Sequence, residues 1–175
     1  MKKIIFILIL GLVVICSIYN NSKSYFEYAK ENVNKYNPKR KDYVIVVDYT
    51  KSILSERLYV IDMVKNEIII SSRVSHAWNS GIFTPNECSN IIGSNKTCVG
   101  TFITRGTTFG KFGYSMIVDG LDKGINNNAK SRAIIVHSTK KMKTIWSNGC
   151  FATSEDVNKK IIDLTKNGCL ICVIN

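Results

Sequence analysis

Short apolar runs rich in β-branched residues recur along the chain from residue 42 onward, separated by polar or glycine-containing breaks. Such runs are typical of β-strands, and their regular succession favours a mostly-β domain. They cover residues 44–47, 58–63, 67–74, 99–103, 114–118, 133–136 and 169–174. The run Val44–Val47 is apolar without alternation, which predicts a strand buried on both faces. The polar pair Lys65–Asn66 between two runs predicts a hairpin.

One segment near the C-terminus has the pattern of an amphipathic helix. Residues 153–156 supply two hydroxyl side chains followed by two carboxylates, which favour a helix start. Apolar residues then recur at Val157, Ile161 and Leu164, at the spacing of one helical face. Asn167–Gly168 is a typical helix stop. We therefore expect at least one helix packed against the strands.

The N-terminus has the layout of an export signal. Two lysines follow Met1 and precede an apolar run over residues 4–18, which is shorter than the roughly 20 residues that span a bilayer easily. Residues 1–24 are therefore interpreted as a signal peptide or an uncleaved membrane anchor. Polar residues 25–41 are interpreted as a spacer, and residues 42–175 as the folded domain. The protein is expected outside the cytoplasm, in the periplasm or cell envelope, secreted or held at the membrane by this segment.

The positive charge lies mainly ahead of the expected domain. The chain has 24 Lys and Arg against 13 Asp and Glu, a formal net charge of +11. Residues 1–41 hold eight basic and two acidic side chains, which leaves only +5 for the remainder. Five of the basic residues are arginines, and no nucleic-acid-binding motif is present. We therefore expect no nucleic-acid partner.

Cysteine and histidine define the candidate chemistry. His137 ends an apolar run, and Cys150 lies in a turn after Ser147, Asn148 and Gly149. A cysteine nucleophile needs a nearby base or cation to form the thiolate at neutral pH. A backbone N–H in such a turn is also suited to bind a developing oxyanion. The spacing is equally compatible with a buried structural cysteine and a hydrogen-bonded histidine.

Several segments resemble a known family. The turn 147–150 with upstream His137 is similar to the signature of the L,D-transpeptidase catalytic domain of the YkuD type, in particular its murein L,D-transpeptidase branch. Ordered partial matches cover most of the expected domain, at residues 48–50, 57–62, 74–76, 79–81, 88–90, 93–94, 113–115, 119–121, 126–129 and 132–137. The resemblance implies a single L,D-transpeptidase-like β-sandwich or barrel with a packed helix after Cys150. Residues 151–153 contain no arginine, although the wider family often has one there.

The resemblance also implies a function. Cys150 would attack the carbonyl of the third residue of a peptidoglycan stem peptide and release D-alanine, and His137 would take the thiol proton. Backbone N–H groups at Gly149 and Cys150 would hold the oxyanion. An amine acceptor would give a 3→3 cross-link by L,D-transpeptidation, and water would give L,D-carboxypeptidase activity. A non-catalytic secreted binding or structural domain is the third alternative. No metal and no organic cofactor is implied.

The other histidine and cysteines have weaker assignments. By resemblance His76 lies near the substrate cleft, so it is a candidate substrate-binding residue or a structural group. Cys88 and Cys98 bracket a polar loop in a chain expected to be exported, which makes them a candidate disulfide. Cys169 and Cys172 are interpreted as core residues, because positions three apart in a strand point to opposite faces.

Overall fold

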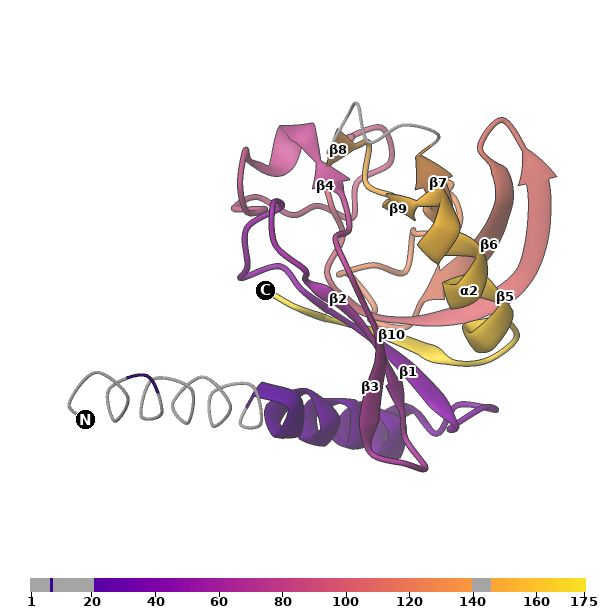
Figure 1. The fold of residues 1–175 in the computed structure, drawn as a ribbon. Helices are drawn as coiled ribbons and strands as arrows, with labels where there is room; N and C mark the ends of the chain where they lie inside the picture. Colours follow the sequence, from indigo (N-terminus) through magenta and orange to yellow (C-terminus); the bar gives the residue numbers. More distant parts are fainter. Residues whose placement is uncertain (1–6, 8–20, 140–145) are drawn as a thin grey trace.

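The computed structural model describes residue 7, residues 21–139 and residues 146–175 of the chain (Figure 1). Eight strands form one sheet in the order β3-β2-β1-β10-β5-β6-β7-β9, which curves into a nearly closed, barrel-like shape. Their bounds are β1 Tyr43–Asp48, β2 Leu58–Asp62, β3 Glu67–Ser72, β5 Gly100–Gly110, β6 Gly113–Gly120, β7 Ile135–Thr139, β9 Phe151–Ser154 and β10 Leu170–Ile174. The predicted mostly-β fold is confirmed.

Smaller elements complete the fold near the turn formed by residues 147–150. β4 (His76–Ala77) pairs in parallel with β8 (Trp146–Ser147) in a separate two-stranded sheet. A short 3₁₀ helix, η1 (Trp78–Ser80), follows β4. The predicted C-terminal helix is present as α2 (Glu155–Thr165), and its Ile161 and Ile162 are fully buried against the sheet.

The two central strands are buried on both faces. Residues 44–47 of β1 are at most 1% exposed, as the continuous apolar run predicts. β1 pairs in parallel with β10, and their side chains alternate between two hydrophobic clusters. Ile45 and Ile171 point into the cluster that α2 covers, while Val44 and Leu170 point into a second cluster on the opposite face. Each face therefore needs its own covering element.

A helix covers the second face, in the region predicted as a polar spacer. Residues 21–36 are helical, and their Tyr25, Ala29 and Val33 are buried against β1 and β10. The Tyr25 hydroxyl also donates a 2.6 Å hydrogen bond to Asp48 Oδ2. The spacer interpretation of residues 25–41 is wrong for this helical part. An apolar residue at every fourth position forms a buried stripe, which the intervening Asn, Lys and Glu residues obscure in the sequence.

The strand predictions differ from the structure mainly around the catalytic residues. The runs at 99–103 and 114–118 extend into a long antiparallel hairpin, β5–β6, with a register shift between Thr104 and Thr107. Residues 151–154 form β9, and its last residue, Ser154, is also the N-cap of α2, so the predicted helix start is confirmed with Glu155 and Asp156 in the first turn. β9 is a four-residue strand that pairs in parallel with β7, a non-local contact that no local pattern records.

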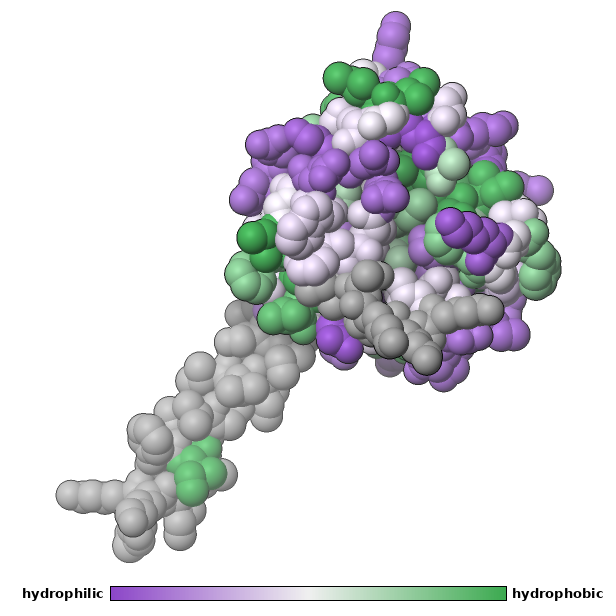
Figure 2. Space-filling view, turned by 90° about the horizontal axis from the view of Figure 1, so that it is seen from above, coloured by the Kyte–Doolittle hydropathy of each residue, from purple (hydrophilic) through white to green (hydrophobic). Residues whose placement is uncertain are grey.

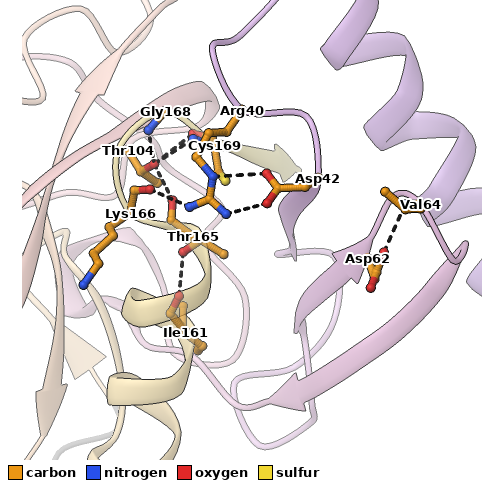
Figure 3. Close-up of polar contacts among 10 residues, drawn as sticks. All are labelled: Arg40, Asp42, Asp62, Val64, Thr104, Ile161, Thr165, Lys166, Gly168 and Cys169. Atoms are coloured by element: carbon orange, nitrogen blue, oxygen red, sulfur yellow. Dashed lines mark hydrogen bonds and ion pairs between the residues drawn. The ribbon is translucent and has the colours of Figure 1, made fainter.

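Buried polar contacts fasten the end of α2 to the sheet (Figure 3). The buried Thr104 hydroxyl donates to the Thr165 carbonyl at 2.6 Å and accepts from the Cys169 N–H at 2.9 Å. Arg40 donates to the Lys166 carbonyl at 2.8 Å and forms two hydrogen bonds with the Asp42 carboxylate. These contacts fix the connection between α2 and β10, so α2 holds a defined position beside β7 and β9.

The expected signal or anchor, residues 1–24, lies almost wholly outside the described residues. Over the part of the chain that the structure describes, no helix is both long enough and apolar enough to cross a membrane.

The packing of helix 21–36 predicts a position-specific effect of a larger side chain. Ala29 is fully buried against the sheet, whereas Lys30 is exposed. Ala29→Leu should lower the free energy of unfolding by about 1–3 kcal/mol through overpacking. Lys30→Leu introduces the same side chain on the exposed face and should change it by less than about 0.5 kcal/mol. Urea unfolding of both variants checks this, and equal effects would contradict the packing.

Candidate active site

The parallel pairing of β7 with β9 positions the candidate catalytic residues. In its register Val136 lies opposite Phe151, and His137 opposite Ala152. Val136 and Phe151 both point into the main hydrophobic cluster. Because side chains alternate along a strand, His137 belongs to the opposite face. Cys150 immediately precedes β9, two residues before the residue paired with His137.

The His137 ring is held in one tautomer. Its Nδ1 lies 2.9 Å from the Ser138 carbonyl oxygen, which can only accept a hydrogen bond, so Nδ1 carries the proton and Nε2 is the free base. Phe112, at the tip of the β5–β6 hairpin, stacks on the ring with centroids 4.1 Å apart. Burial lowers the pKa of His137 below its ordinary value near 6.5, so the neutral form is favoured.

The Cys150 thiol is protonated in this environment. It is half-buried and donates a long, 3.6 Å hydrogen bond to the Ala133 carbonyl. Burial raises the pKa of the Cys150 thiol, and the Ile135 backbone and the Arg132 charge oppose that rise in part. No hydrogen bond between Cys150 and His137 is present among the described residues. The resting pair is therefore a neutral thiol and a neutral imidazole that still has an unprotonated nitrogen.

The turn before Cys150 is tightly built. The Ser147 hydroxyl donates to the Cys150 carbonyl at 2.8 Å and accepts from the Gly149 N–H at 3.1 Å, while Asn148 is exposed at the tip. Gly149 has φ +117°, and a Cβ there would lie 2.9 Å from the Lys96 carbonyl oxygen. Only glycine fits without displacing backbone. Because the Gly149 N–H is engaged, the oxyanion role predicted for Gly149 has no free donor in this conformation.

Ser75 is a positioning residue that the sequence did not single out. Its hydroxyl donates to the Cys150 carbonyl at 3.1 Å and accepts from the Ala152 N–H at 3.0 Å. Its own N–H donates to the Ala152 carbonyl at 2.9 Å. Ser75 therefore fixes the backbone of Cys150 and Ala152 from a position 75 residues before Cys150. A lone serine at such a separation gives no spacing signal in the sequence.

His76 is fully buried, and both of its ring nitrogens are engaged. Arg57 Nη2 donates to His76 Nδ1 at 2.8 Å, and His76 Nε2 donates to the Gly81 carbonyl at 2.8 Å. Burial lowers the pKa of His76, which favours the neutral ring that this pattern requires. In this structure His76 is a structural group with no nitrogen free for substrate, contrary to the substrate-binding assignment.

Arg57 is a fully buried cation held by neutral acceptors. Besides His76, it donates to the Val74 carbonyl through Nε and Nη2, at 3.0 and 2.7 Å, and to the Lys51 carbonyl at 3.2 Å. Its guanidinium lies 4.9 Å from the centre of the Tyr49 ring. The Tyr49 hydroxyl donates to the Ser75 carbonyl at 3.0 Å. Arg57 and Tyr49 together therefore fix residues 74–76, which in turn hold the catalytic turn.

Cys88 and Cys98 are free thiols in the structure, so the candidate disulfide is not formed there. Cys88 forms an isolated bridge with Thr97, and successive residues of an extended chain point to opposite sides, so Cys98 faces away. The Cys98 sulfur instead accepts from Arg132, which also donates to the Lys96 carbonyl beside Gly149. Both C-terminal cysteines, at positions 169 and 172, are fully buried, as expected for core residues.

A cavity of about 440 Å³ lies on the His137 side of the site. Phe112, which stacks on His137, and Ser138, whose carbonyl binds it, both contribute to its wall. The rest of the lining comes from the β5–β6 hairpin and α2, namely Phe109, Gly113, Tyr114, Glu155, Asn158, Lys159 and Asp163. No cluster of three or more potential metal-ligating side chains is present in the ranges that the structure covers.

The site thus combines a half-buried thiol, in a turn fixed from two sides, with an oriented imidazole on the neighbouring strand, an arrangement compatible with cysteine nucleophile chemistry. The model of the L,D-transpeptidase catalytic domain family matches residues 18–173. The chain therefore belongs to this family. None of the curated proteins compared with the chain matches it.

Solved structures show a similar fold at low sequence identity. The helical cell shape determining protein Pgp2 from Campylobacter jejuni (K307A mutant) is 13% identical, with a TM-score of 0.53, over 78% of this chain and 48% of that protein. An L,D-transpeptidase from Mycobacterium smegmatis is 15% identical, with a TM-score of 0.47, over 77% and 59%. The chain thus spans only about half to three-fifths of these proteins.

The close approach at Gly149 predicts loss of the reactive geometry on substitution. Gly149→Ala should slow alkylation of Cys150 by iodoacetamide and lower catalytic turnover by about 100-fold, because the turn must shift. Gly106→Ala is the matched control, since its nearest neighbour would lie at 3.9 Å without a left-handed backbone. Wild-type rates in Gly149→Ala would show that the turn does not depend on glycine.

The pKa shifts of His137 and Cys150 predict two pH profiles: kcat/KM should fall at low pH, and the rate of Cys150 alkylation should not level off at neutral pH. His137 must be unprotonated to act as a base, so kcat/KM should fall as the pH drops through a pKa below 6.5. Alkylation of the resting Cys150 should keep rising up to and beyond pH 9, because its thiol pKa is raised. Rate–pH profiles measure both. A thiolate already formed at pH 6 would contradict the neutral pair.

Proposed function

We propose that this protein catalyses L,D-transpeptidation of peptidoglycan stem peptides through a Cys150 thioester. The observation that carries the proposal is the placement of Cys150 directly before β9, which pairs in parallel with the strand of His137, and the His137 proton fixed on Nδ1. Membership of the L,D-transpeptidase catalytic domain family supports it. The protein would act outside the cytoplasm, where stem peptides are exposed.

The first half-reaction would form the acyl-enzyme. His137 Nε2 accepts the Cys150 thiol proton as sulfur attacks the carbonyl carbon of the third stem residue. The Cys150 N–H stabilises the oxyanion, because the Gly149 N–H is already bound to Ser147. The tetrahedral intermediate collapses by breaking the C–N bond to D-alanine, and His137 returns its proton to the leaving amine.

The second half-reaction would decide the product. An amine from a neighbouring stem attacks the thioester, loses its proton to His137 and displaces the thiol, which gives a 3→3 cross-link. Water in the same position gives a tripeptide and therefore L,D-carboxypeptidase activity. Both outcomes use the same acyl-enzyme.

The cavity beside His137 would bind the part of the donor stem that follows its third residue. Its volume of about 440 Å³ is in the range of sites that enclose small ligands. Its aromatic wall at Phe109 and Phe112 suits the apolar parts of a peptide. The stem would reach Cys150 along the stacked Phe112 and His137 rings.

Reaction of the full-length protein with disaccharide-tetrapeptide tests this function. Mass spectrometry should detect D-alanine release together with 3→3 dimers. Cys150→Ala should abolish both products, and His137→Gln should lower acylation by about 10²–10⁴-fold, the usual range for a general base. Tripeptide without dimers would identify the carboxypeptidase alternative. No product and no thioester from the wild type would support the non-catalytic alternative.

A further inference from the structure

The two tryptophans of the chain meet beside the catalytic turn. Trp78 begins η1 and Trp146 begins β8, 68 positions apart in the sequence, yet their rings pack edge to face with centroids 4.4 Å apart. The β4–β8 ladder brings them together by pairing His76 with Trp146 and Ala77 with Ser147. The proposed mechanism uses neither indole. Trp146 is four residues from Cys150 in the chain, and the β4–β8 ladder brings Trp78 to Trp146.

Both indoles are held in place and still accessible. Trp78 is 54% exposed, and Trp146 is partly exposed. Trp146 Nε1 donates to the Ile82 carbonyl at 3.0 Å, which fixes one edge of its ring. A large aromatic pair is usually buried, because each ring buries about 150–250 Å² on packing. An ordered pair left open to solvent therefore indicates a binding surface.

The two described segments that contain the pair are largely apolar and carry no charge. Ile82 and Phe83 beside it are more than half exposed, at 56% and 59%. The segments 77–86 and 146–154 contain no charged residue, and their exposed polar groups include the amides of Asn79 and Asn148. Figure 2 looks onto the end of the molecule with β4 and β8, where hydrophobic patches lie among hydrophilic residues. Such a surface suits a neutral ligand with flat apolar faces and hydroxyl or amide edges.

The Trp78–Trp146 pair, here called the platform, lies within reach of Cys150. Trp146 and Cys150 are four residues apart, which spans at most about 14 Å even in extended chain. The Ser147 contact with the Cys150 carbonyl shortens that distance further. In peptidoglycan, a lactyl group, two residues and the backbone of the third residue separate the sugar from the third-residue carbonyl, roughly 13 Å at full extension by the same reach per unit. The sugar of a stem bound at Cys150 is therefore within reach of the indole pair.

We propose that Trp78 and Trp146 form a binding site for an N-acetylated sugar of the glycan strand that carries the donor stem. This inference rests on the proposed function and adds the glycan as a recognised part of the substrate. One pyranose ring stacks its C–H face on an indole, and the acetamido methyl packs on Ile82 and Phe83. The Asn79 and Asn148 amides face the hydroxyl edges. An ammonium-bearing side chain fits less well, because no carboxylate lies in these segments.

Intrinsic fluorescence tests the site directly, because the only two tryptophans of the chain are the two in the platform. The full-length Cys150→Ala protein is titrated with triacetylchitotriose, and maltotriose serves as the sugar without acetamido groups. A saturable change in tryptophan emission with the acetylated trimer alone is the expected result. No change, or an equal change with maltotriose, would overturn the proposal.

Single substitutions assign the effect to the pair. Trp78→Ala and Trp146→Ala each leave one reporter, and each should weaken binding by about tenfold or more, the scale of losing one stacked ring. Trp78→Phe should restore most of the affinity, since it restores an aromatic face. Ile125→Ala removes an exposed apolar side chain elsewhere and should bind like the parent. Undiminished binding in both alanine variants would refute the site.

Vesicles and turnover separate this proposal from its competitors. A blue shift of tryptophan emission with phosphatidylglycerol vesicles, without any response to chitotriose, would make the platform a membrane contact and overturn the glycan site.

In active protein, kcat/KM for the disaccharide-tetrapeptide should exceed that for the free tetrapeptide, and Trp78→Ala should bring the ratio towards one. An unchanged ratio refutes the glycan site alone. Absence of turnover with both substrates refutes the proposed function and leaves the fluorescence result standing.

Discussion

The geometry of the site depends on one buried cation. Arg57 has no exposed surface, and its donors go to two backbone carbonyls and the His76 ring rather than to a carboxylate. Removing such a group leaves several buried acceptors without a partner, which costs on the order of 3 kcal/mol or more. Lysine could not replace it, because a single ammonium cannot reach acceptors spread around a planar fork.

What Arg57 holds is the segment that assembles the site. Residues 74–77 bind the catalytic turn through Ser75 and pair with β8 through His76 and Ala77. The same short segment, residues 74–77, therefore positions both Cys150 and the tryptophan pair. His76 contributes to this arrangement as a neutral ring that accepts on one nitrogen and donates on the other. His137 differs, because its Nε2 has no hydrogen-bond partner among the described residues.

The sequence predicted features that rest on local pattern or on family resemblance. The unbroken run Val44–Val47 predicted two-sided burial, because only a strand covered on both faces needs apolar residues at every position. The family resemblance singled out His137 and Cys150; the structure places His137 in β7 and Cys150 directly before β9, the strand that pairs with β7. Ser75 and β9 could not be predicted, since both depend on contacts with distant segments. Helix 21–36 was missed because three small or aromatic contacts at four-residue spacing stand among polar residues.

The way helix 21–36 joins the sheet has a mechanical consequence. Hydrogen bonds from Tyr25 to Asp48 and from Tyr28 to the Val173 carbonyl fasten it across the two central strands. It lies at the opposite end of the molecule from β4, β7, β8 and β9 (Figure 1). Helix 21–36 is therefore fixed in orientation relative to the sheet. Helix 21–36 and the turn that carries Cys150 therefore belong to one rigid body and lie at its opposite ends.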